Sequence, residues 1–240
     1  MRPVKNTSRG PISPATICPI NGRALTAAVL LLAVGCGHSK LIPAPSAARV
    51  PGAPGAAFLV LGVIGCSADA QAWQGQAVEL PDSVTPVKVR VANSSGRPIG
   101  LLYQDFALVG QNGHRYLPIP VLPLDPDTQS TRLDPIYASS KFFVAERFHD
   151  VYQGVDPWPQ PLRRDDELYE TQYRRWGQRP STDVVRMGMP EGVLGEGGVI
   201  SGFLYFERPV HEDRVTFEAE FDSSEGPDTI ALVKIPFWVE

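Results

Sequence analysis

A chain of 240 residues, 43% of them hydrophobic, is long enough to bury its own core. All 26 acidic residues lie after position 68, whereas six of the 22 basic residues lie before it, so residues 69–240 carry a formal charge of −10. This acidic remainder lacks the clustered cations that nucleic-acid binding requires, and we expect no nucleic-acid partner.

The first 35 residues have the composition of an export signal. An apolar run at residues 24–34 follows Arg23. It is shorter than the ~20 residues that cross a bilayer and suits the hydrophobic region of a signal peptide. The run ends in Ala33-Val34-Gly35-Cys36, which resembles the lipobox of bacterial lipoproteins. The resemblance implies cleavage before Cys36, acylation of Cys36 and, because no Asp follows, an outer-membrane lipoprotein that faces the periplasm.

A second cysteine offers an alternative lipidation site. Residues 56–65 are apolar and end in Val63-Ile64-Gly65-Cys66. The competing interpretation of this run is a strand of the mature domain. We predict a signal peptide at 1–35, disordered or helical, and a Pro- and Ala-rich tether with a short apolar run at 36–68. With Cys18 as the third cysteine, the chain has no disulfide framework, and its stability must come from a packed core.

The remaining residues, 69–240, have the alternation of β-strands. Residues 85–91 alternate valines with Lys88 and Arg90, and a turn at 93–98 precedes a second apolar run, which predicts a hairpin. Asn112-Gly113 predicts a type I′ turn between residues 106–110 and 114–118. Further strands are expected at residues 77–80, 199–207, 214–221 and 229–239. This pattern predicts an antiparallel β-sandwich.

A helical insertion is predicted at residues 134–177. Residues 136–152 and 165–176 have apolar side chains at helical spacing, and the Pro-rich segment 154–162 separates them as a loop. Asp165 and Asp166 stand where a helix N-terminus favours negative charge.

Three segments together resemble a known class of domain. VKVRVANSSGRPI (residues 87–99), DFALVGQNGHRY (105–116) and GFLYFE (202–207) are similar to the immunoglobulin-like domains of uncharacterised exported bacterial lipoproteins. The resemblance implies a mainly β protein with an immunoglobulin-like sandwich in the cell envelope. It carries no catalytic signature.

The aromatic residues of the insertion are the candidate partner-binding surface. More than one face of residues 136–152 is apolar, which favours docking of an envelope protein or glycan. The alternative is that the insertion caps the sandwich and buries these side chains. The candidate residues are Phe142, Phe143, Tyr152, Trp158, Tyr173 and Trp176.

Two methionines offer a second function. Met187 and Met189 are soft thioether ligands two residues apart, which suits Cu(I), although methionine is also an ordinary core residue. The four histidines have no ligand spacing, and no nucleotide-binding or hydrolase motif is present, so we expect no cofactor and no catalytic residues. The sequence therefore predicts a non-catalytic binding or structural lipoprotein. The alternatives are a copper-handling module and an unrecognised envelope hydrolase.

Overall fold

A computed structural model describes residues 40–75, 80, 84–123, 141–152, 154–226 and 228–240. The protein is mainly β, as the alternating pattern predicts, and residues 37–240 form one compact unit. Among the described residues, none of the helices is long and apolar enough to span a membrane.

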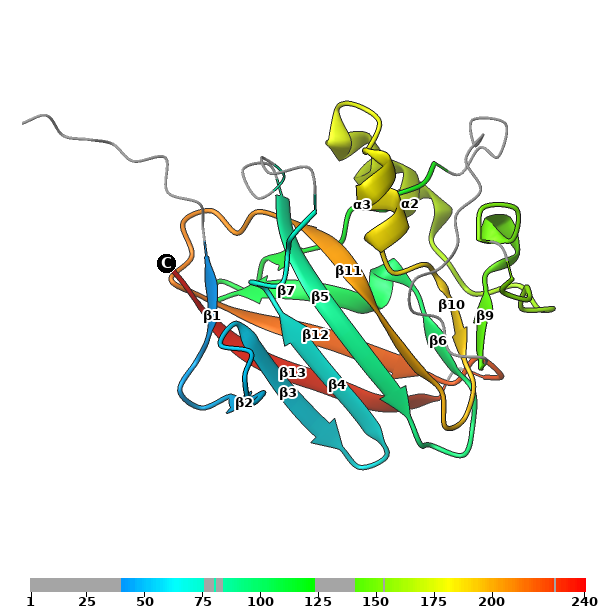
Figure 1. Cartoon of the computed structure of the whole chain (residues 1–240), viewed down its shortest axis with the longest axis horizontal. Helices are drawn as coiled ribbons and strands as arrows, with labels where there is room; N and C mark the ends of the chain where they lie inside the picture. The colour runs from blue at the N-terminus through cyan, green and yellow to red at the C-terminus, as the bar shows by residue number, and fades with distance from the viewer. Residues whose placement is uncertain (1–39, 76–79, 81–83, 124–140, 153, 227) are drawn as a thin grey trace, which may run out of the picture. The chain divides into compact units, whose positions relative to one another are not determined.

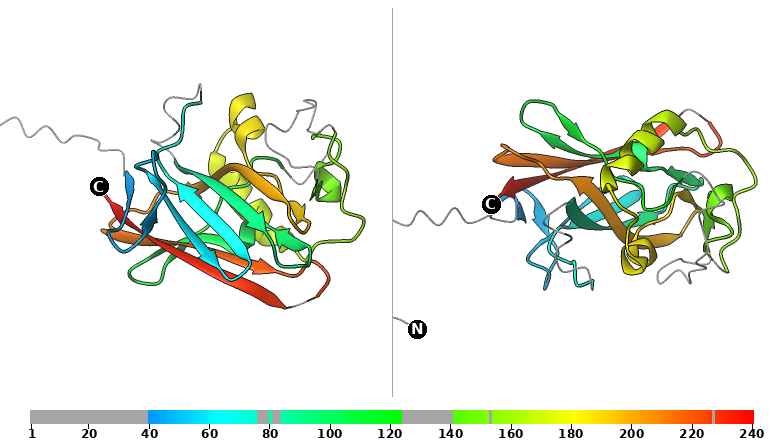
Figure 2. Two further views of the ribbon diagram at one scale, coloured as in Figure 1. Left: turned by 60° about the horizontal axis from the view of Figure 1, so that its bottom comes forward. Right: turned by 90° about the horizontal axis from the view of Figure 1, so that it is seen from above.

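Three antiparallel sheets make up the unit (Figures 1 and 2). Sheet 1 contains, in spatial order, β1 (Leu41–Pro43), β13 (Thr229–Val239), β12 (Arg214–Asp222), β7 (Phe106–Gly110) and β8 (Arg115–Tyr116). Sheet 2 contains β11 (Val199–Glu207), β5 (Val84–Asn93), β4 (Ile64–Asp69), β3 (Ala56–Leu61) and β2 (Ala48–Arg49). Sheet 3 is small and contains β6 (Ile99–Leu101), β10 (Gly192–Leu194) and β9 (Phe142–Val144).

Sheets 1 and 2 share one hydrophobic core. In Figure 1 the strands of sheet 2 lie in front of β12 and β13. Val87, Val89 and Val91 of β5 are buried, whereas Lys88 and Arg90 are exposed, so the predicted alternation is confirmed. From sheet 1, Phe217 and Phe221 of β12 face the same core. This arrangement is consistent with a β-sandwich, in which the two inner faces exclude water from a common interior.

Pro86 shows how a proline fits within β5. Proline cannot donate to a sheet ladder and is confined to positions without a partner on that side. On one side Pro86 lies opposite Tyr205 of β11. On the other side, the pairing with β4 ends at Asp69, which lies opposite Lys88. Around Pro86, β5 is therefore an edge strand.

The helices were predicted from the sequence only in part. Helix α2 (Asp166–Tyr173) confirms the second predicted helix, and the Asp165 side chain accepts a hydrogen bond from the Leu168 amide at 2.9 Å, an N-cap. The 3₁₀ turn η4 (Arg174–Trp176) continues it. Helix α3 (Thr182–Met187) was not predicted from the sequence. Two further 3₁₀ turns are η1 (Tyr103–Asp105) and η3 (Glu146–Phe148).

The first predicted helix, at 136–152, is wrong over its described part. Phe142–Val144 forms β9, which pairs with β10, and Glu146–Phe148 is a 3₁₀ turn. In β9 the side chains of Phe142 and Val144 are buried and Phe143 is half-buried, a strand alternation within a run too short to tell from a helix. Residues 136–140 lie outside the described residues.

The predicted hairpin of residues 85–103 is also wrong, because β5 and β6 lie in different sheets. Asn93 explains why the chain leaves sheet 2. Its buried side-chain amide donates to the carbonyl oxygens of Arg97 at 2.8 Å and Leu194 at 2.9 Å, and its Oδ1 accepts from the Ser95 amide at 2.9 Å. Asn93 thus connects sheet 2 to sheet 3 rather than closing a hairpin.

The hairpin at Asn112-Gly113 is confirmed, with a different turn. Leu108 pairs with Tyr116 and Val109 with Arg115. Gly113 has a φ of +82°, but Asn112 does not adopt a positive φ, so the turn is not type I′. The Asn112 side chain instead accepts a hydrogen bond from the His114 amide at 2.7 Å. Of the predicted strand at 77–80, only Leu80 lies within the described residues.

The tether predicted at 36–68 is wrong from Leu41 onward. Residues 41–43 form β1 against β13, and β2, β3 and β4 extend sheet 2 from residue 48 to residue 69. The small and Pro-rich composition predicts a tether, but Ala57 and Ala68 pack in the core, and Pro43 lies on an edge strand, where proline is tolerated. The folded unit therefore includes strands well before Asp69.

Candidate functional site

The structure describes one of the two cysteines proposed for lipidation. Cys36 lies outside the described residues. Cys66 lies in the middle of β4, paired with Leu59 on one side and Val91 on the other, and its side chain is 3% exposed. Burial raises the pKa of the Cys66 thiol to about 12. A buried, protonated thiol within a sheet is a core residue rather than a reactive one.

Of the six aromatic residues proposed as a docking surface, two are buried and four are half-buried. Phe142 and Tyr152 are buried in the core. Phe143 and Trp158 are half-buried and pack on each other with ring centroids 5.6 Å apart. The remaining two, Tyr173 and Trp176, are half-buried beside the sandwich. Phe142 and Tyr152 therefore belong to the core, as the capping alternative expects, and a docking role for the other four stays a prediction.

Trp176 shows how the helical layer is held. Its indole Nε1 donates to the carbonyl of Pro120 at 2.7 Å, and its ring lies 5.7 Å from that of Tyr205 in β11. The Tyr205 hydroxyl in turn donates to the carbonyl of Val184 in α3 at 3.0 Å. These contacts fix η4 and α3 against sheet 2.

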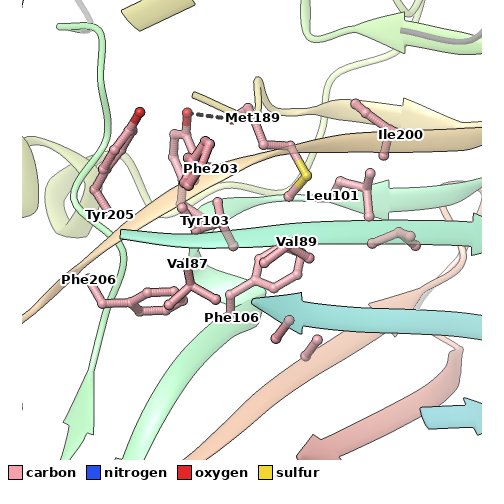
Figure 3. Close-up of a cluster of buried hydrophobic side chains, with 14 of the residues drawn as sticks. Val87, Val89, Leu101, Tyr103, Phe106, Met189, Ile200, Phe203, Tyr205 and Phe206 are labelled. Carbon is pink, nitrogen blue, oxygen red and sulfur yellow. Dashed lines mark hydrogen bonds between the residues drawn. The ribbon is translucent and has the colours of Figure 1, made fainter. Parts of the chain in front are cut away.

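The two methionines proposed for copper lie in different environments. Met189 is 2% exposed, and its side chain points into the core toward Leu101 (Figure 3). Its backbone amide donates to Phe203 at 2.8 Å, and its carbonyl accepts from the Tyr103 hydroxyl at 2.8 Å. Met187 is half-buried and packs on the same core. Across the described ranges, three or more His, Cys, Asp or Glu side chains never gather where they could hold a metal.

The structure brings together a buried ion pair that the sequence did not indicate. Arg164 Nη1 donates to Glu191 Oε2 at 2.6 Å, and Glu191 Oε1 accepts from the Tyr103 amide at 2.8 Å. The Glu191 side chain is 1% exposed and that of Arg164 10%. The Arg164 guanidinium also lies over the Tyr169 ring, 5.3 Å from its centroid. The sequence shows Arg164 only as one charge among many before α2, and its partner is 27 residues away.

A small cavity adjoins this ion pair. Its volume is about 20 Å³, which suits one water molecule rather than a metabolite. Arg164, Tyr169 and Gln172 are among the residues that line it. The Gln172 side chain is buried, and its Oε1 has no hydrogen-bond partner among the described residues. The cavity beside α2 is therefore too small to be a substrate cleft.

A larger hollow of about 340 Å³ lies beside Asp105 and Asp222. Burial, opposed by a hydrogen bond from the Leu102 amide at 3.2 Å, raises the pKa of Asp105 to about 8, and the negative charge of Asp222 adds to the rise. Asp105 therefore keeps its proton at neutral pH. Its carboxyl also caps η1, which gives it a structural role, and the sequence carries no motif for a partner acid or base at this place.

Comparisons with protein-family models, with curated proteins and with solved structures give no significant match for this chain.

Proposed function

We propose that this chain is a lipid-anchored, non-catalytic binding or structural module of the bacterial cell envelope, held by Cys36 in the outer membrane and facing the periplasm. The observation that carries the proposal is the position of the lipobox-like segment. Cys36 lies four residues before Lys40, and β1 begins at Leu41. Cleavage before Cys36 would leave the whole described domain intact, directly after its anchor.

The alternative anchor at Cys66 is much less compatible with this fold. Cleavage before Cys66 would remove β1, β2 and β3, and with them the partners of β13 and β4. It would also cut β4 and remove Ile64, whose side chain is buried in the core. This geometry supports Cys36 as the anchored residue.

We further propose that the sandwich is immunoglobulin-like. The supporting observation is strand order. In sheet 2, β4, β5 and β11 are neighbours, and in sheet 1, β7, β12 and β13 are neighbours. Taken in chain order, these six strands follow the A-B-E and C-F-G arrangement of immunoglobulin domains. On this assignment, β6 lies between strands B and C, and β8, β9, β10 and the two α-helices lie between strands C and E.

The partner of a domain tethered so closely would be another envelope component, a protein or a glycan, because these are the macromolecules within its reach. Copper handling has weaker support, because Met189 serves as core and as a backbone hydrogen-bond partner. A hydrolase has weaker support too, because the Asp105 carboxyl caps η1 and accepts a hydrogen bond from the Leu102 amide at 3.2 Å, which is a structural role.

The test is lipid labelling in a bacterial host that carries the lipoprotein-processing enzymes. We expect the wild-type chain to incorporate a clickable palmitate analogue and a Cys36→Ser variant to lose the label. A Cys66→Ser variant is the matched control and should keep the label. Label that persists in Cys36→Ser, or is absent from the wild type, would contradict the proposal.

A further inference from the structure

The hairpin formed by β3 and β4 carries an exposed apolar surface. Four of the seven exposed large hydrophobic side chains in the described part of the chain lie in it: Phe58 (38% exposed), Val60 (61%), Leu61 (43%) and Val63 (46%). Phe58 and Val60 alternate along β3 on the outer face of sheet 2, and Leu61 and Val63 flank Gly62 at the tip. Contiguous apolar side chains in water indicate a surface that is covered in use.

Cations lie on the same face of sheet 2. Register places Phe58 opposite Ser67, and Ser67 opposite Arg90. In the next row on this face, Val60 lies opposite Gly65, and Gly65 opposite Ala92. Lys88 precedes Arg90 by two residues on β5, and both are exposed. Ser67 and Gly65 thus separate the apolar side chains of β3 from β5. In the remaining row Asp69 lies opposite Lys88, whereas Arg90 lies between Ser67 and Ser201, so the positive side of this face is centred on Arg90.

Strands β1 to β4 contribute almost no negative charge to this corner. The described residues from Lys40 to Ala68 contain no Asp or Glu, and the first is Asp69, at the end of β4 away from the hairpin tip. The loop beside the tip, whose Ser94 amide donates to the Val63 carbonyl at 2.9 Å, holds Arg97, paired with Asp228 at 3.4 Å. An acidic protein thus presents one corner that an anionic surface does not repel.

We propose that this corner, formed by β2, β3, β4 and the outer face of β5, lies on an anionic lipid surface. Val60, Leu61 and Val63 would enter the boundary between headgroups and acyl chains, and Lys88 and Arg90 would face lipid phosphates. The assignment rests on the proposed lipid anchor at Cys36. Four residues extend at most ~14 Å, so an anchor there holds Lys40, and with it the acid-free strands, close to the membrane.

The test uses the chain that begins at Gly37, which contains the whole buried core and lacks the lipid. An environment-sensitive dye is attached to a Val60→Cys variant. The one other cysteine in this chain, Cys66, is buried and does not compete for the dye. Val210→Cys is the matched control, because Val210 is 56% exposed and lies outside the hairpin.

We expect the dye at position 60 to shift to the blue with vesicles of phosphatidylglycerol and phosphatidylcholine, and not with phosphatidylcholine alone. The dye at position 210 should not shift. Adding Lys88→Glu and Arg90→Glu to the Val60→Cys variant should weaken vesicle binding at least about tenfold, given ~1 kcal/mol for each cation near an anionic surface. Circular dichroism checks that each variant is folded.

Three results would overturn the proposal: no shift at position 60, an equal shift at position 210, or a shift without vesicles that grows with protein concentration. The last would assign the exposed edge of β3 to pairing with a second copy of the chain. If Cys36 takes up palmitate and position 60 does not respond, this inference fails and the proposed function stands. If position 60 responds and Cys36 takes up no lipid, the proposed function fails on its own.

Discussion

The two carboxylate oxygens of Glu191 accept hydrogen bonds from different segments: Oε2 accepts from Arg164 Nη1 at 2.6 Å, and Oε1 accepts from the Tyr103 amide at 2.8 Å. One buried side chain thereby joins three segments: the approach to α2, the start of η1, and the residue just before β10. The sandwich and its helical layer meet at this carboxylate. The pairing of β6 with β10 already brings Tyr103 and Glu191 together, and the ion pair adds the approach to α2 to them.

Breaking this ion pair should therefore destabilise the fold. We expect Arg164→Met to lower the free energy of unfolding by ~3–5 kcal/mol, because it leaves the Glu191 carboxylate buried without its charge partner. Arg97→Met is the control, since Arg97 pairs with Asp228 at the surface and should cost less than ~1 kcal/mol. Urea unfolding measures both, and equal losses would show that the buried pair has no special weight.

Asp105 makes the stability depend on pH. Its pKa is about 8 in the fold and 3.8 ordinarily, so between these values the folded state binds a proton that the unfolded state has lost. The contribution of this group is therefore most favourable below pH 4 and is lost as the pH rises through 8. Asp105→Asn keeps an acceptor for the Leu102 amide and removes the loss.

We expect Asp105→Asn to be more stable than the wild type by roughly 2–5 kcal/mol at pH 8, and within about 1 kcal/mol of it at pH 4. Denaturant unfolding at the two pH values measures the difference. A gain of the same size at both would mean that Asp105 does not carry the pH dependence.

Phe217 lies at the centre of the core. Its side chain is 0% exposed, and its ring centroid lies 6.2 Å from that of Phe206 and 6.3 Å from that of Phe106. We expect Phe217→Ala to cost ~3–5 kcal/mol. Leu232→Ala, at a side chain that is 40% exposed on β13, should cost less than ~1 kcal/mol. Thermal or urea unfolding would refute the assigned strand face if Phe217→Ala lost less than the Leu232 variant.

Gly113 tests the turn between β7 and β8. It has a φ of +82°, and an added Cβ would meet no atom within 4 Å, so the cost of Gly113→Ala is purely conformational, ~1–2 kcal/mol. Gly100 has equally open space without a positive φ, and Gly100→Ala should be neutral or slightly stabilising. If the two variants unfold alike, the left-handed conformation of Gly113 has no energetic role.

The strands that alternate without interruption were predictable from sequence. Arg214–Asp222 and Thr229–Val239 fall within a residue of their expected bounds, because one buried face fixes a period of two. Val199–Glu207 also has its expected bounds, although both of its faces are buried from Gly202 to Phe206. Helix α2 was predictable from its Asp165 cap. Short segments with distant partners were not predictable: the alternation of β9 is too brief to tell from helical spacing, and its own residues do not indicate the pairing with β10.

The site features depended on contacts that no spacing reveals. Glu191 and Arg164 are ordinary charges until the fold removes them from water, and Asp105 acquires its raised pKa only from burial. The acid-free run before Asp69 was visible in the sequence, but its meaning changed. Its composition predicts a tether, whereas in the structure it contributes β1 to sheet 1 and β2, β3 and β4 to sheet 2.

The most direct measurement for the account is the intact mass of the chain purified from bacterial membranes, with sequencing of its first peptide. We expect a polypeptide that starts at Cys36, with the added mass of acyl chains on that residue and none on Cys66. A mature chain that starts at any other residue, or that carries no lipid, would contradict it.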